Sequence, residues 1–70
     1  MVIYKMEFLY LMINGPEWED NIIFTMKEDA IKSSIESPNS RVEIFIKNPI
    51  TNEYSPTYNY YKNGIYYISS

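Results

Sequence analysis

The chain has 70 residues, a net charge of −3, and neither Cys nor His. This length predicts a single domain, residues 1–70, with a small core and a narrow margin of stability. Disulfides, thiolate sites and imidazole ligands are excluded, so association with another chain is the remaining way to reinforce so small a scaffold. The acidic balance disfavours general nucleic-acid binding, which requires a basic face.

We expect no secretory signal in the first residues, because Lys5 and Glu7 interrupt any apolar segment. The longest apolar run, from Phe8 to Ile13, is far shorter than the roughly 20 residues of a membrane-spanning helix. We therefore expect an intracellular protein without a membrane contact. Acidic residues concentrate in residues 1–36, with seven carboxylates and three cations, whereas residues 37–70 have two carboxylates and three cations.

Alternating apolar residues predict a first strand over residues 2–13, whose second half is apolar on both faces. Asn14-Gly15-Pro16 has the composition of a turn. A second, antiparallel strand is expected within residues 18–24. Its beginning, at Trp18 or at Asn21, is left open because the intervening residues are poor strand formers.

A helix is predicted from about Met26 to Ser37, followed by Pro38. Thr25 and Glu28 have the spacing of a capping box, in which each side chain hydrogen-bonds to the other residue's backbone amide. One narrow apolar stripe, suited to packing on a sheet, is formed by Met26, Ala30, Ile31 and Ile35.

Residues 41–47 alternate most regularly and predict a strand with Val42, Ile44 and Ile46 pointing inward and Phe45 on the other face. A loop is expected over residues 48–56, which contain two prolines.

The last hairpin is predicted from Asn63-Gly64, which favours a two-residue turn between strands over residues 57–62 and 65–69. That turn places Tyr61 opposite Tyr66 and Tyr60 opposite Tyr67, with the two pairs on different faces of the hairpin.

The elements therefore predict an α+β fold of order ββαββ, with room for a fifth strand, in which one helix packs on one face of an antiparallel sheet. A single short helix covers only part of such a sheet, and the uncovered face carries aromatic residues. Exposed apolar patches usually mark binding sites. We expect self-association through this face or through a free edge strand to bury it.

Six of the eight tyrosines fall in the last seventeen residues, around the predicted hairpin turn. Tyrosine combines an apolar ring with a polar tip, which suits partly wet surfaces. Three interpretations remain open: packing within the sheet without a ligand, a homodimer surface, and a stacking surface for a ligand or nucleic acid. The candidate residues for a partner or dimer interface are Tyr58, Tyr60, Tyr61, Tyr66, Tyr67 and Trp18.

Trp18 is flanked by Glu17, Glu19 and Asp20. These carboxylates could hold Ca²⁺, could meet a basic partner with Trp18 as an anchor, or could form a solvated turn with Trp18 on the core side. No second carboxylate motif accompanies them, so we expect no metal and no cofactor. The chain has neither Cys nor His, so it lacks the nucleophile–base pairs that these residues form in enzymes. We therefore expect a protein that is not an enzyme.

Three segments together resemble small uncharacterised proteins of large DNA viruses that infect amoebae, of the marseillevirus type: Trp18-Glu19-Asp20, Arg41-Val42-Glu43-Ile44-Phe45, and the segment from Pro56 to Gly64. The resemblance spans most of residues 8–64. It implies a viral accessory protein, in the host cytoplasm or the virion, and it transfers no activity and no functional residue.

Taken together, these observations predict a non-enzymatic protein-interaction module that forms a homodimer and leaves the acidic turn free for a further, unknown protein partner. The alternative is binding of single-stranded nucleic acid through the Tyr-rich C-terminal hairpin.

Overall fold

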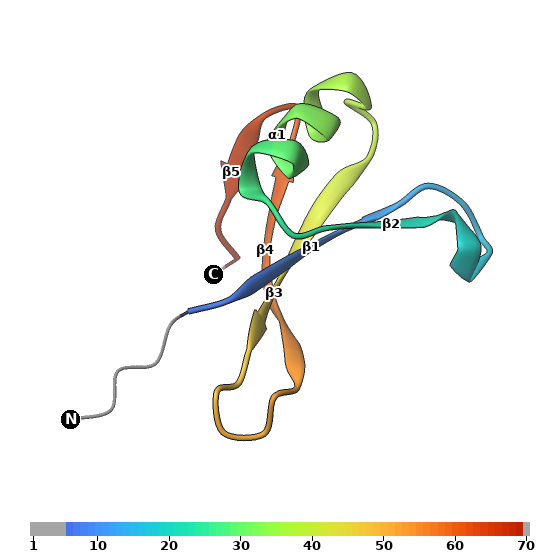
Figure 1. Cartoon of the computed structure of the whole chain (residues 1–70). Helices are drawn as coiled ribbons and strands as arrows, with labels where there is room; N and C mark the ends of the chain where they lie inside the picture. Colours follow the sequence, from blue (N-terminus) through green and yellow to red (C-terminus); the bar gives the residue numbers. More distant parts are fainter. Residues whose placement is uncertain (1–5, 70) are drawn as a thin grey trace.

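The computed structural model describes residues 6–69, which form one antiparallel sheet with a helix on one face (Figure 1). The strands are β1 (Phe8–Ile13), β2 (Asn21–Phe24), β3 (Arg41–Lys47), β4 (Tyr54–Lys62) and β5 (Ile65–Tyr67), and the helix is α1 (Lys27–Glu36). The spatial order of the strands is β2-β1-β3-β4-β5. This confirms the predicted α+β class and element order, with β5 as the fifth strand.

The core lies between α1 and the sheet face beneath it. Tyr10 and Met12 of β1 stand opposite Ile44 and Val42 of β3, and Val42 stands opposite Tyr61 of β4. These residues share one face because alternate strand residues point to the same side. The buried apolar cluster is Tyr10, Met12, Ala30, Val42, Ile44 and Tyr61.

The first hairpin differs from its prediction at the start of β1, and it decides between the two starts that were left open for β2. β1 begins at Phe8, preceded by Met6 and Glu7, and residues 2–5 of the predicted strand lie outside the described residues. Trp18–Asp20 form a 3₁₀ turn, η1, so β2 begins at Asn21. The Glu17 amide donates to Asp20 Oδ2 at 3.2 Å, which closes η1 and competes with strand pairing in this polar segment.

The predicted capping box is wrong. The N-cap of α1 is Met26, in an extended conformation (φ −112°, ψ 130°) and without a side-chain cap hydrogen bond. Phe24 still pairs with Tyr10 of β1 and Met26 is extended, so the helix begins at Lys27, one residue later than the box requires.

The predicted apolar stripe is only half correct. Ala30 is fully buried and Ile31 half-buried, but Met26 and Ile35 are more than half exposed. Ser34 occupies the buried position instead, one turn after Ala30. Two small residues, i and i+4, allow the helix to approach the sheet closely at this point.

β4 begins at Tyr54, so the predicted loop ends three residues early, and β5 ends at Tyr67 rather than at Ser69. Pro56 lies within β4, opposite Phe45. A proline is tolerated there because the short β5 pairs only with residues 60–62, which leaves the Pro56 end of β4 as an edge. The predicted register of the last hairpin is confirmed: Tyr60 pairs with Tyr67, and Tyr61 with Tyr66.

Within residues 6–69, no helix has the length and apolar character that crossing a membrane requires.

Candidate functional site

The sheet side away from α1 carries apolar residues from every strand, and we call it the open face. Its apolar members include Leu9, Leu11, Ile13, Ile23, Phe45, Tyr54, Tyr60, Ile65 and Tyr67. They pair across strands, with Leu9 opposite Phe45 and Leu11 opposite Ile23. Ile13 and Ile23 are 56% and 62% exposed. No element formed by the described residues covers this face, since α1 lies on the other side.

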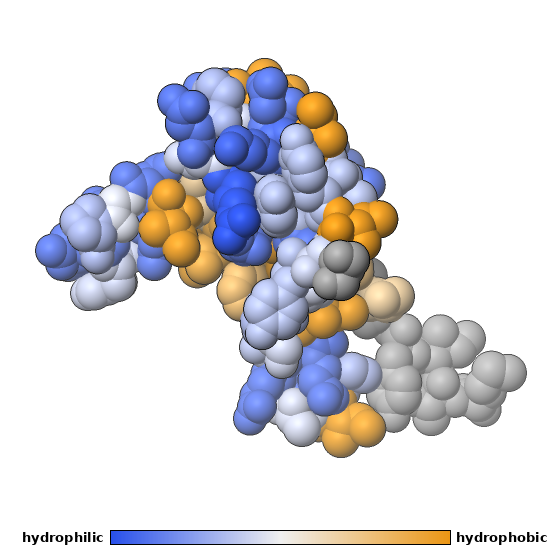
Figure 2. All heavy atoms as spheres, turned by 180° about the vertical axis from the view of Figure 1, so that it is seen from behind, coloured by the Kyte–Doolittle hydropathy of each residue, from blue (hydrophilic) through white to orange (hydrophobic). Residues whose placement is uncertain are grey.

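Polar side chains interrupt the open face. Seen from behind the helix, apolar groups alternate with strongly hydrophilic ones and do not form one continuous surface (Figure 2). Arg41 and Glu43 of β3 contribute here, with Nε of Arg41 lying 2.6 Å from Oε1 of Glu43. Lys47 Nζ lies 3.2 Å from Glu7 Oε2. Exposed ion pairs of this kind contribute ~0–1 kcal/mol each, so they affect specificity more than stability.

Tyr60 and Tyr67 form a stacked pair on the open face, with ring centroids 5.0 Å apart and an interplanar angle of 12°. The guanidinium carbon of Arg41 lies 4.6 Å from the centroid of the Tyr60 ring, within the range of a cation–π contact. Arg41 is thus held from two sides, by Glu43 and by Tyr60. The result is an ordered layer of one cation and two rings.

A hollow of about 610 Å³ lies beside this layer. Its walls include Phe45, Pro56, Tyr58, Tyr60 and Tyr67. Tyr58 is 68% exposed and has a positive φ of 68°, a conformation that bulky residues rarely adopt.

The structure confirms that the two tyrosine pairs of the last hairpin lie on different faces, and it shows which pair faces the helix. Tyr58, Tyr60 and Tyr67 gather on the open face, whereas Tyr61 and Tyr66 lie on the helix side. Tyr61 is a core residue, 7% exposed, with its ring centroid 6.3 Å from that of Tyr10 and 5.4 Å from that of Tyr66. Tyr66 remains 47% exposed at the edge of the sheet.

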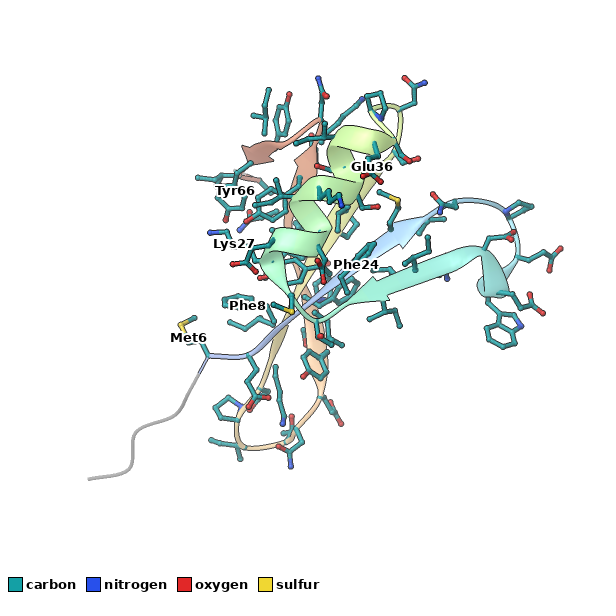
Figure 3. The ribbon with its side chains drawn as sticks, turned by 45° about the horizontal axis from the view of Figure 1, so that its top comes forward. Met6, Phe8, Phe24, Lys27, Glu36 and Tyr66 are labelled. Atoms are coloured by element: carbon teal, nitrogen blue, oxygen red, sulfur yellow. The ribbon has the colours of Figure 1, made fainter. Side chains whose placement is uncertain are left out.

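Tyr66 borders a second hollow, of about 510 Å³, on the helix side. Phe8 and Lys27 line it too, and both lie on the same side of α1 as Tyr66 in Figure 3. Tyr10 contributes its phenol, whose pKa is raised above its ordinary value of 10.0, mainly by burial and further by Tyr61 and Glu28. The Tyr10 phenol is therefore neutral at physiological pH.

Trp18 lies apart from the tyrosines and is 78% exposed. It sits in the turn of the β1–β2 hairpin, which projects away from the helix in Figure 1, and β2 and β5 form opposite edges of the sheet. The interpretation that placed Trp18 on the core side is wrong, because η1 contains no buried residue. Among residues 6–69, no three carboxylates gather in a way that could hold a metal ion, those of this turn included.

No protein-family model matches the chain, and comparisons with curated proteins and with solved structures found no match either. Two features of the open face were missing from the predicted site. Leu9, Leu11 and Phe45 were visible in the sequence as apolar residues on the second face of their strands. The conformation of Tyr58 had no comparable signal, because it depends on the register between β3 and β4.

Proposed function

We propose that the protein is a non-enzymatic interaction module that forms a homodimer through its open face. One observation carries this proposal: α1 covers one face of the sheet, while the other presents cross-paired apolar side chains such as Leu11 and Ile23 to solvent. Exposed apolar surface of this kind usually marks a contact site. A second sheet packed on it would remove these side chains from water.

A second copy is the favoured partner because the fold has a small core of its own. Its buried apolar cluster contains six residues, one of them an alanine. A 70-residue chain without Cys lacks disulfides to compensate. Closed twofold dimers are the commonest solution for such chains, and they use one self-complementary patch.

The distribution of charge also supports contact between two copies of an acidic chain. The carboxylates of η1 and of the first turn of α1 lie on the β1–β2 turn and on the helix side. The open face instead has three cations, Arg41, Lys47 and Lys62, and two carboxylates that pair with two of them. Two copies meeting through this face thus bring their least acidic sides together.

The experiment is a measurement of mass by light scattering during gel filtration. The wild-type chain should have twice its mass of 8.4 kDa. Replacing Tyr60 and Tyr67 with Ser should return the mass to that of a monomer, because both rings leave the open face. Circular dichroism must show that this variant is still folded, since loss of a cross-strand aromatic pair itself costs about 0.2–1 kcal/mol.

Trp18→Ser is the matched control, because it removes an aromatic ring that is more exposed than Tyr67 (78% against 40%) and lies in the β1–β2 hairpin, at the other edge of the sheet from β5. It should leave the mass unchanged. A dimer that persists after the double tyrosine substitution but dissociates with Trp18→Ser would place the contact on the β1–β2 turn and overturn the proposal.

Binding of single-stranded nucleic acid is the second candidate, favoured by the layer of Arg41, Tyr60 and Tyr67. Aromatic rings beside a cation are the elements of a stacking platform for bases. The two ion pairs of the open face weaken this candidate, because they neutralise Arg41 and Lys47. A labelled oligonucleotide that the protein shifts at low salt, with a steep loss as salt rises, would support it.

A further inference from the structure

Strand β4 contains a bulge that presents Tyr58 on the open face. Glu43 stands opposite Tyr60, but Phe45 stands opposite Pro56. Between these two pairs, β3 has one residue, Ile44, whereas β4 has the three residues 57–59. Extra residues of this kind bend a strand and redirect a side chain.

The two neighbours of Tyr58 hold this bulge in place. Thr57 Oγ1 donates to the Ile44 carbonyl oxygen at 2.8 Å and accepts from the Asn59 amide at 3.1 Å. The Asn59 side chain bridges to β5 and beyond: its Nδ2 donates to the Tyr66 hydroxyl at 3.0 Å, and its Oδ1 accepts from the Ser69 amide at 3.0 Å. The Ile44 carbonyl and the Asn59 amide thus have the Thr57 side chain as a partner, and Tyr58 lies between two hydrogen-bonded neighbours.

Tyr58 itself is strained and exposed. Its φ of 68° lies in the left-handed region, where a β-carbon meets the backbone, and its side chain is 68% exposed. An exposed side chain gains little burial within its own chain to compensate for such a conformation. Strained residues held in place by their surroundings are typical of functional positions.

We infer that Tyr58 is the anchor of the homodimer, and that its ring enters the hollow of a second copy. This inference rests on the dimer proposed above and names the residue that makes its central contact. The open face offers both halves of such a contact, the exposed Tyr58 ring and the aromatic hollow of about 610 Å³ at whose wall this ring lies. A twofold axis through the face would place each ring at the partner's hollow.

The charges beside the hollow favour a second copy over a strongly charged partner. Arg41 and Glu43 lie next to each other in its wall, one positive and one negative. Under a twofold axis, the cation of one copy can approach the carboxylate of the other, so this pair is complementary to itself. A basic or acidic peptide would meet one group of the wrong sign.

The test compares substitutions that separate the ring from the backbone conformation. Asn and Gly adopt the left-handed region more readily than Tyr, so Tyr58→Asn and Tyr58→Gly should preserve the bulge while removing the ring. Tyr58→Phe keeps the ring. We expect the dimer Kd, measured by sedimentation equilibrium, to rise at least about tenfold in the first two variants and to change less than about threefold in the third.

A stability measurement distinguishes an anchor from a residue that merely supports the fold. In the Tyr60→Ser, Tyr67→Ser background, which is expected to be monomeric, adding Tyr58→Asn should leave the thermal midpoint unchanged or raise it by a few degrees (~2–5 °C). A fall of that size would show that the Tyr58 ring stabilises its own chain, and would overturn the inference.

The outcomes also separate this inference from the proposed dimer. If the wild-type chain is a dimer that the double tyrosine substitution dissociates, but Tyr58→Asn and Tyr58→Gly bind as tightly as wild type, only the anchor is wrong. A wild-type chain that stays monomeric at every concentration overturns both.

Discussion

Ser34 makes one hydrogen bond within the helix and one that joins the helix to the last hairpin. Its side chain is fully buried; Oγ donates to the Ile31 carbonyl oxygen at 2.7 Å and accepts from the Gly64 amide at 2.9 Å. Gly64 is required at that point of the turn, since its φ is +78° and an added β-carbon would lie 2.9 Å from Cγ1 of Ile35. The helix thus rests directly on the turn.

Ser34→Ala should therefore destabilise the protein by about 1–3 kcal/mol, because the Gly64 amide loses its partner. Urea unfolding monitored by circular dichroism measures this change. Ser33→Ala is the matched control: Ser33 Oγ donates to the Met12 sulfur, a weak acceptor, at 3.6 Å, and its loss should cost less than about 0.5 kcal/mol. Equal stability of the two variants would mean that water replaces Ser34 at the Gly64 amide.

Sequence reasoning identifies apolar residues at this scale better than buried polar ones. Val42 and Ile44 were predicted to point inward, and they are buried. Ser34 was passed over because periodicity arguments count only apolar residues, and a serine becomes a core residue only where a partner such as the Gly64 amide is within reach. Tyr61 shows the converse: it was a candidate for an interface and lies in the core.

At the scale of elements, the N-terminus of α1 is incompletely capped. Met26 occupies the N-cap without a side-chain acceptor, and it is 57% exposed. Met26→Asp would supply such an acceptor and a negative charge at the positive end of the helix dipole. We expect a stabilisation of about 0.5–2 kcal/mol, measured as a shift in the urea midpoint.

Thr25→Ala is the control, because the capping box predicted from the sequence would make it costly. With the N-cap at Met26, Thr25→Ala should change the free energy of unfolding by less than about 0.5 kcal/mol. A decrease of about 1 kcal/mol in the free energy of unfolding would instead indicate that Thr25 caps the helix.

The elements differ in how far local sequence determines them. β3 matches its predicted range of residues 41–47, and the last hairpin has its predicted register, since alternation and Asn63-Gly64 act within a few residues. The capping box failed because the pairing of Phe24 with Tyr10 overrides local helix signals. The bulge at Tyr58 follows from pairing between β3 and β4, which local sequence does not encode.

At the scale of the whole molecule, the sequence already indicated an uncovered sheet face, because a single helix of this length cannot cover it. The sequence did not show which residues meet on that face. Alternation predicted that Tyr60 and Tyr61 lie on opposite sides of the hairpin, and the register confirms it, but the sequence did not show which of them faces the helix. The open face combines tyrosines of β4 and β5 with aliphatic residues of β1 and β2.

If the homodimer reinforces so small a core, its stability must depend on concentration. Dissociation accompanies unfolding in such a dimer, and mass action then raises the thermal midpoint as the protein becomes more concentrated. We expect the wild-type midpoint to rise by a few degrees (~2–5 °C) for each tenfold increase in concentration, measured by differential scanning fluorimetry. The Tyr60→Ser, Tyr67→Ser variant should show a constant midpoint. A constant midpoint for the wild type as well would mean that the 70 residues are stable as a monomer, with the open face left to a different partner.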